Sequence, residues 1–201
     1  MKTLITVFSH ERLHHLKLCL GCLTKAVTPT EVREFEIVVI DDNSDDPGIR
    51  EYLTEQLDGD KISAILVPDQ KIEGTDHYTR GFRCAVARGE AYEEFLQRES
   101  DYLLMLDDDI VVGHETLHEA LDDFEALRKT EFLNPGALTL HALVTHHTFT
   151  VFGGKMFAEL RYSGEANCLF TRGAMIEAGN QYKPCREGFA DHQFKAIKAA
   201  G

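Results

Sequence analysis

The sequence predicts one α/β domain with a mainly parallel, Rossmann-like central sheet that helices flank on both faces. In the first half of the chain, short aliphatic and β-branched runs alternate with stretches of helical hydrophobic period, which is the order that builds parallel sheets. The chain has 201 residues, of which 43% are hydrophobic, enough to bury one sizeable core. No repeat, low-complexity tract or linker interrupts the sequence, so we expect residues 1–201 to form a single domain.

Strand and helix signals alternate from the start of the chain to residue 106. Aliphatic or β-branched runs predict strands at residues 3–8, 36–40, 62–67 and 101–106. Hydrophobic residues with helical spacing predict helices between them, at residues 11–26, 49–57 and 78–97. In the first of these helices, Cys19 and Cys22 form a CxxC without a second pair at zinc-ribbon spacing. We therefore interpret both cysteines as packing residues.

The pattern changes after a further amphipathic helix at residues 115–129. The turn formers Asn134, Pro135 and Gly136 break the chain, and strand signals at 137–144, 148–152 and 166–170 follow without long helices between them. These signals predict a smaller mixed or antiparallel extension of the same sheet, with residues 153–155 as a hairpin turn. Short helices are expected at residues 172–178 and 190–200.

Composition limits the partners and the compartment of the protein. The chain has 21 Lys plus Arg against 34 Asp plus Glu, a formal net charge of −13, which disfavours nucleic acid as a partner. Five Cys, an odd number without paired spacing, fit a reducing compartment. No stretch approaches the roughly 20 apolar residues of a membrane helix, and the start lacks a signal-peptide pattern. We therefore expect a cytoplasmic protein with no membrane span.

Two clusters of carboxylates directly follow predicted strands. Asp41 and Asp42 come after the strand at 36–40, and Asp107, Asp108 and Asp109 come after the strand at 101–106. The carboxyl ends of parallel strands meet at one edge of a sheet, where ligands bind in open α/β folds. Asp107 and Asp109 can point to the same side in extended backbone, and such oxygen ligands suit Mg²⁺ or Mn²⁺ together with diphosphate oxygens. Taken alone, the triplet is equally consistent with an acidic turn in solvent.

Four segments, in order along the chain, carry a family resemblance. They are Thr6-Val7-Phe8-Ser9-His10, residues 35–44 with a DDxS turn, residues 102–109 with a hydrophobic strand that leads into a DxD motif, and Gly188-Phe189-Ala190-Asp191-His192-Gln193-Phe194. Over nearly the whole chain, they resemble family 2 glycosyltransferases of the GT-A fold. The resemblance implies sugar transfer from a nucleotide-sugar with Mn²⁺ or Mg²⁺ as cofactor. It also implies a donor half, residues 1–109, and an acceptor half, residues 110–201.

The resemblance also implies which residues bind the donor. Asp42, with Asp41 beside it, would recognise the uracil or ribose of a donor bound next to Phe8 and Ser9, which favours a UDP-sugar. Arg80 and Arg83, near the start of the helix at 78–97, could contact donor phosphates. A solvated helix face is an equally good interpretation of these two residues.

The metal and the catalytic base are implied in the same way. Asp109 would bind the metal directly, and Asp107 or Asp108 would contact the metal or the donor ribose. Asp191, in the position of the aspartate of the family's late ED motif, would be the base that takes the acceptor proton, with inversion at the anomeric carbon. His192 would orient Asp191 or reach the metal. One departure concerns the base: Ala190 stands where the family usually has Glu. Glu187 is the alternative base.

Two other functions stay open at the level of sequence. A nucleotidyltransferase acting on sugar phosphates also uses strand-end carboxylates, but its usual glycine-rich loop is missing from Ser9-His10-Glu11-Arg12. A non-catalytic nucleotide-sugar-binding protein would keep only the donor site. The expected acceptor is a saccharide or another hydroxyl-bearing molecule. The sequence ends ten residues after Asp191, which leaves room for a partner or a homo-oligomer to complete the acceptor wall.

Overall fold

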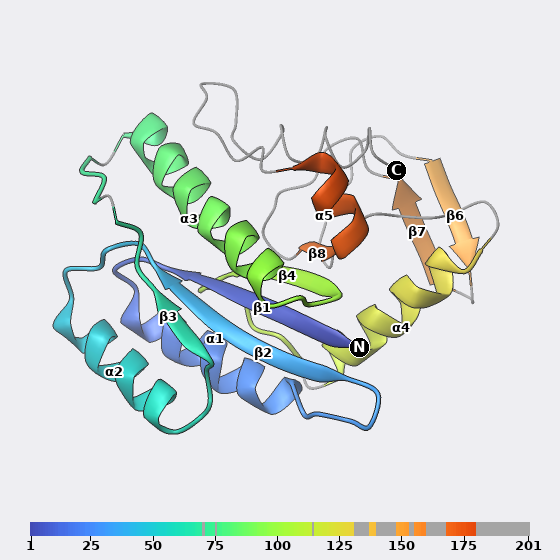
Figure 1. Ribbon diagram of the computed structural model, residues 1–201, viewed down its shortest axis with the longest axis horizontal. Coiled ribbons are helices and arrows are strands. Elements are labelled where there is room, and N and C mark those ends of the chain that lie inside the picture. Colours follow the sequence, from blue (N-terminus) through green and yellow to red (C-terminus); the bar gives the residue numbers. More distant parts are fainter. Residues whose placement is uncertain are drawn as a thin grey trace.

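The first half of the chain folds as the predicted alternation of strands and helices (Figure 1). The computed structural model describes residues 1–69, 71–74, 76–113, 115–130, 137–139, 148–152, 155–159 and 168–179. The first seven elements are β1 (Lys2–Ser9), α1 (Leu13–Ala26), β2 (Glu34–Asp41), α2 (Pro47–Asp58), β3 (Ala64–Leu66), α3 (His77–Gln97) and β4 (Tyr102–Asp107). Local signals set several boundaries. The side chain of Asp46 caps α2 by accepting a hydrogen bond from the Gly48 amide, and Pro47 follows at the first helical position.

The second half adds antiparallel strands, as predicted, but not all to the same sheet. Its elements are α4 (Thr116–Arg128), β5 (Ala137–Thr139), β6 (Thr148–Phe152), β7 (Lys155–Glu159), β8 (Cys168–Thr171) and α5 (Arg172–Ala178). The main sheet has the order β3-β2-β1-β4-β8-β5, in which β8 runs antiparallel to β4 and to β5. The predicted helix at 190–200 lies outside the described residues.

The sequence-based prediction was wrong about the place of β6. We expected residues 148–152 to extend the main sheet, whereas β6 and β7 form a separate two-stranded sheet. Their antiparallel pairing agrees with the hairpin turn predicted at residues 153–155. The register pairs Phe152 with Lys155, so only two residues connect the strands. Such a short connection directs β6 to its neighbour in sequence rather than to the main sheet.

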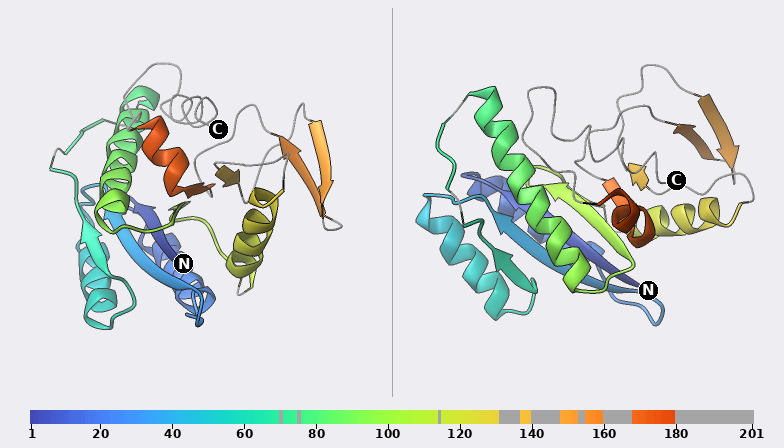
Figure 2. Two further views of the ribbon diagram at one scale, coloured as in Figure 1. Left: turned by 45° about the vertical axis from the view of Figure 1, so that its right-hand side comes forward. Right: turned by 45° about the horizontal axis from the view of Figure 1, so that its top comes forward.

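The main sheet is the middle layer of three. Alternate residues of its strands point to opposite faces, so Ile5 and Val7 pack against α1, α2 and α4, whereas Leu4 packs against α3 and α5. Figure 2 shows helices on both sides of the sheet. Cys19 of α1 is buried in the first of these cores, and burial raises the pKa of its thiol to about 12. Cys19 and Cys22 are free thiols, in line with the packing interpretation.

The order of the strands brings the acidic segments together. β1 lies between β2 and β4 and is parallel to both, with Ser9 opposite Asp41 and Phe8 opposite Asp107. Backbone hydrogen bonds continue just beyond the strands, from the Asp42 amide to the Ser9 carbonyl at 2.9 Å and from the Asp108 amide to the Phe8 carbonyl at 3.1 Å. The carboxyl ends of β1, β2 and β4 therefore form one edge, which we call the rim.

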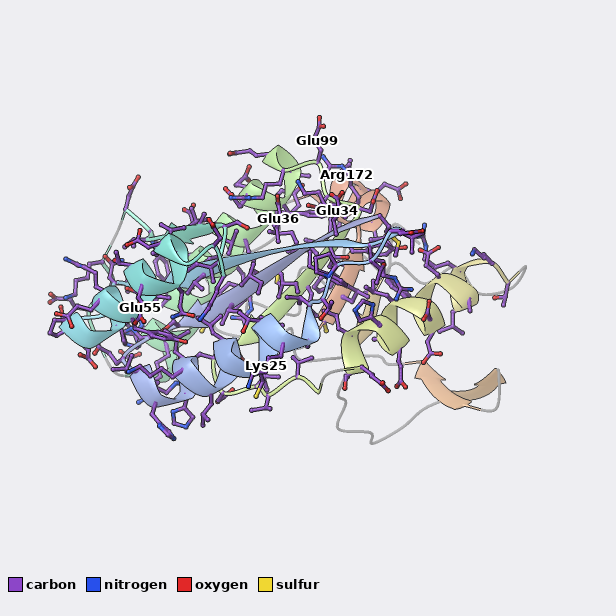
Figure 3. All side chains as sticks on the ribbon, turned by 90° about the horizontal axis from the view of Figure 1, so that it is seen from below. Lys25, Glu34, Glu36, Glu55, Glu99 and Arg172 are labelled. Carbon is purple, nitrogen blue, oxygen red and sulfur yellow. The ribbon has the colours of Figure 1, made fainter. Side chains whose placement is uncertain are left out.

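The outer surfaces of the helices are polar. Figure 3 shows Lys25 on α1 and Glu55 on α2 among the charged side chains, and both residues are exposed. Across the part of the chain that the structure describes, no helix is both long enough and apolar enough to cross a membrane.

Candidate functional site

The rim collects the predicted acidic residues and directs them to two faces of the sheet. Side-chain alternation along β2 and β4 sends Asp42 and Asp107 toward α3, where they meet arginines. Asp41 is directed to the other face, where it accepts a hydrogen bond from the Ser44 hydroxyl at 2.5 Å. Asp108 meets Arg12 at the start of α1. The expectation that both clusters converge on one edge is therefore confirmed.

Asp42 belongs to a three-residue cluster with Arg83 of α3 and His10. Arg83 Nε lies 3.3 Å from the Asp42 carboxylate, and Arg83 Nη1 lies 3.1 Å from His10 Nε2. Because a guanidinium can only donate, His10 Nε2 accepts, and His10 Nδ1–H donates to the Asp42 carbonyl at 3.0 Å. Burial raises the pKa of Asp42, while His10 and Arg83 oppose the rise. The contact with His10 Nε2 thus orients Arg83 toward the rim.

Asp107 is paired with Arg88, five residues after Arg83 on α3. Arg88 Nη2 donates to Asp107 Oδ1 at 3.3 Å. The same guanidinium stacks over the ring of Phe8 at 5.0 Å from the ring centroid, a cation–π contact that fixes its orientation. The predicted donor residue Phe8 therefore lies beneath a buried arginine beside Asp107. Arg80, on the same helix, is exposed, and its contact with donor phosphates stays a prediction.

Asp108 and Asp109 share a third arginine, Arg12. The guanidinium of Arg12 forms a short ion pair with Asp108 through Nη2 and a hydrogen bond of 2.9 Å to Asp109 through Nη1. Asp108 is 0% exposed, and burial raises its pKa to about 6, although Arg12 acts in the opposite direction. Its Oδ2 atom has no hydrogen-bond partner among the described residues.

Asp107 and Asp109 face different arginines, which differs from the expectation for extended backbone. β4 ends at Asp107, and the Ile110 amide donates to the Asp107 carbonyl at 3.1 Å, which marks a turn. The alternation of a strand no longer applies across that turn. Asp109 therefore reaches the guanidinium that Asp108 also contacts.

A hollow of about 260 Å³ lies beside Asp41, between the ends of β2 and β3 and the start of α2. Its lining is Asp41, Asn43, Ser44, Asp45, Arg50, Leu53, Ile65, Val67 and Lys71. Asn43 adopts the left-handed conformation, with φ of 52°, and its side-chain amide donates to the Pro68 carbonyl at 3.0 Å. Burial raises the pKa of Asp41, which the hydrogen bonds of Ser44 oppose. The hollow combines polar groups with the apolar side chains of Leu53, Ile65 and Val67.

The acidic residues at the end of β4 suit a divalent cation shared with a ligand. Within the described ranges, no group of three or more His, Cys, Asp or Glu side chains could hold a metal alone. Asp107 and Asp109 are partly exposed, at 34% and 44%, and each uses one oxygen on an arginine. Mg²⁺ is commonly held by one or two carboxylates together with substrate phosphates, and this donor set fits that arrangement.

Several site residues were not evident from the sequence, and others fall outside the described part. We had not singled out Arg12 or Arg88, because nothing in the local pattern marks a surface arginine that reaches across the fold. The carboxylate triplet does imply a cation to offset its charge, and these two side chains supply it. The predicted base Asp191, its alternative Glu187 and the predicted ligand His192 lie outside the described residues.

Comparison with known proteins identifies the fold. No protein-family model matches the chain, and no curated protein matches its sequence. Among solved structures, S. aureus TarS residues 1–349 in complex with UDP is 18% identical over 98% of this chain, with a TM-score of 0.65. Mannosyltransferase PcManGT from Pyrobaculum calidifontis, in complex with GDP-Man and Mn²⁺, is 13% identical over 97% of this chain, with a TM-score of 0.60. The chain has the GT-A fold.

The GT-A chain corresponds to only part of each of these structures. It covers 55% of the TarS structure and 51% of PcManGT. A second TarS structure of residues 1–349 gives the same extent, with 19% identity over 99% of this chain and a TM-score of 0.61. At these identities, the likeness concerns the fold, and the function must be argued from the rim.

Proposed function

We propose that this protein is a metal-dependent glycosyltransferase that moves a sugar from a nucleotide-sugar to an acceptor hydroxyl. The observation that carries the proposal is the rim, where carboxylates at the ends of β2 and β4 meet Arg12 and the arginines of α3 at the carboxyl edge of a GT-A sheet. Ligands of open α/β sheets bind at this edge. The UDP in TarS and the GDP-Man and Mn²⁺ in PcManGT support the choice of ligand class.

The donor would span the rim from β2 to β4. We assign the nucleoside to the hollow beside Asp41, whose carboxylate can accept hydrogen bonds from a base or a ribose. β2 and β4 are separated by β1, so their ends lie about 10 Å apart at the usual spacing of strands. That separation suits a nucleoside at one end and a diphosphate at the other. We favour a UDP-sugar because of the DDxS turn that includes Asp42.

Arginines and carboxylates would have different roles at the diphosphate end: the arginines contact phosphates and the carboxylates bind the metal. Arg83 and Arg88 hold positive charge close to the rim from the α3 side and can neutralise phosphate oxygens. Asp107 and Asp109 would hold Mn²⁺ or Mg²⁺ with their partly exposed carboxylates. A bound divalent cation supplies charge that neutralises the departing diphosphate.

The acceptor side of the proposal concerns residues outside the described part. Asp191 would take the proton of the acceptor hydroxyl during direct displacement, which inverts the anomeric configuration. His192 would orient Asp191 or bind the metal, and a saccharide or similar hydroxyl-bearing molecule would be the acceptor. Proton NMR of the product tests the stereochemistry, and a retained anomeric signal would remove the single-displacement step.

A donor screen tests the function. Thermal unfolding with UDP-, GDP- and dTDP-sugars, each with Mn²⁺ or with EDTA, should show a stabilisation that needs both a nucleotide-sugar and the metal. Isotope-labelled donors then report turnover. Slow release of UDP and free sugar supports a transferase, and release of pyrophosphate supports a nucleotidyltransferase. Binding without either product indicates a non-catalytic nucleotide-sugar-binding protein.

A further inference from the structure

Arg12 contacts the acidic residues that follow β4 from the start of α1. It immediately precedes α1, and its guanidinium contacts Asp108 through Nη2 and Asp109 through Nη1. Two nitrogens of one guanidinium therefore engage two successive carboxylates of the triplet. A positive charge on the protein thus lies where the proposed function requires a divalent cation to approach Asp109.

The backbone around Arg12 is fixed by contacts to the turn that follows β2. Glu11 has a φ of 56°, which is rare for a residue with a side chain. Its amide donates to Ser44 Oγ at 3.1 Å, and its carboxylate accepts a hydrogen bond from the Asp45 amide. These bonds hold the β1–α1 loop against the wall of the hollow and thereby set the position from which Arg12 reaches the triplet.

The two contacts of Arg12 differ in their access to water. Asp108 is 0% exposed, whereas Asp109 is 44% exposed and the Arg12 side chain is 43% exposed. Separating a buried carboxylate from its partner is strongly unfavourable, because the charge cannot be solvated. An exposed ion pair contributes little and exchanges readily. The Asp108 contact is therefore the permanent one, and the Asp109 contact is the one that can open.

We infer that Arg12 is a positioning residue that competes with the divalent cation for Asp109. Without ligand, Arg12 bridges Asp108 and Asp109; when the metal and a nucleoside diphosphate bind, it releases Asp109 and stays on Asp108. The released nitrogen then faces the added phosphate charge. This inference rests on the proposed function, because it needs a metal at Asp109.

Competition and a purely structural role of Arg12 predict opposite changes in Mn²⁺ affinity. If Arg12 only supported the fold, its loss would weaken metal binding. If it competes, Arg12→Gln should bind Mn²⁺ more tightly. Two unit charges about 4 Å apart change an affinity about fivefold even in the dielectric of water, and the double charge of Mn²⁺ makes the effect larger. We therefore expect the Mn²⁺ dissociation constant to fall at least about fivefold.

Electron paramagnetic resonance of free Mn²⁺ during titration of the metal-free protein, with and without UDP, measures this constant. Arg12→Lys keeps the charge and should stay within about threefold of the parent. Arg128→Gln is the matched control: Arg128 contacts Tyr102, the first residue of β4, at the opposite edge of the sheet from the rim. Its loss should leave Mn²⁺ affinity unchanged. A folded Arg12→Gln variant whose affinity is equal to or weaker than that of the parent overturns the inference.

A second measurement does not depend on the folding of Arg12→Gln. In protein labelled with ¹⁵N-arginine, the Arg12 side-chain signal, assigned by its loss in Arg12→Lys, should shift when Mg²⁺ and UDP are added. An unchanged signal at saturation overturns the inference. Failure of the proposed function looks different, because neither the parent nor Arg128→Gln would then take up Mn²⁺ with UDP.

Discussion

The burial of Asp108 makes the stability of the protein depend on pH in a predictable direction. Burial raises the pKa of Asp108 from its ordinary 3.8 to about 6, so the folded protein holds this proton more tightly than the unfolded chain does. Between about pH 4 and pH 6, the unfolded chain has lost the proton that the folded protein still holds. The stability that protonated Asp108 contributes is therefore lost as the pH rises through this range. A difference of about two pH units, at about 1.4 kcal/mol each, amounts to about 3 kcal/mol.

Asp108→Asn tests this reasoning because the amide has the same shape and does not titrate in this range. The free energy of unfolding of Asp108→Asn minus that of the parent should increase by about 3 kcal/mol from pH 4 to pH 7. Urea unfolding in buffers with EDTA, followed by circular dichroism, measures both values at each pH. Asp58→Asn makes the same chemical change at an exposed position at the end of α2 and serves as the control. A difference that stays constant or decreases over this window would refute the assignment of a buried, proton-binding Asp108.

Three further predictions concern the site and the core. Asp109→Ala should lose the Mn²⁺-dependent thermal stabilisation by nucleotide-sugars, because it removes a proposed metal ligand; a shift equal to that of the parent would exclude Asp109 from that role. Asp191→Asn should still bind donor, as measured by titration calorimetry, but should transfer at least about 100-fold more slowly if Asp191 is the general base; parent-like turnover would remove Asp191 from the mechanism. Leu104→Ala should destabilise the fold by about 2–5 kcal/mol in urea unfolding, because Leu104 is 0% exposed in the centre of β4; a loss below about 1 kcal/mol would contradict its place in the core.

The parallel part of the fold was predictable because its signals are local. Residues 37–40 of β2 are aliphatic and buried, so their sequence pattern and their environment agree. β7 gave no such signal, because Lys155 and Glu159 at its ends leave only three uncharged residues between them. α1 begins at Leu13 rather than at residue 11 because Glu11 takes a left-handed conformation that no helix includes. Contacts with Ser44 and Asp45 accompany that conformation, and the sequence around Glu11 does not encode them.

The positions of the site residues were predictable where they follow directly from the ends of the strands. Asp41, Asp42 and Asp107 were placed together because parallel strands end at one edge. Arg83 was a candidate for contact with donor phosphates, but the pairing of these carboxylates with arginines was not predicted, since ion pairs between distant residues depend on how helices pack on the sheet. Arg12 and Asp109 are separated by 97 residues, and no periodicity connects them. Arg88 similarly reaches Asp107 only because α3 lies over the ends of β1 and β4.

The antiparallel direction of β8 separates changes near the rim from changes in the parallel part of the sheet. Because β8 is antiparallel to β4, it begins rather than ends near the rim, with Cys168 opposite Met105. The first residue of β8 therefore lies near the edge where β1, β2 and β4 present their acidic residues. A substitution at Cys168 changes a neighbour of that edge, whereas the pairing of β1 with β2 and with β4 does not involve β8.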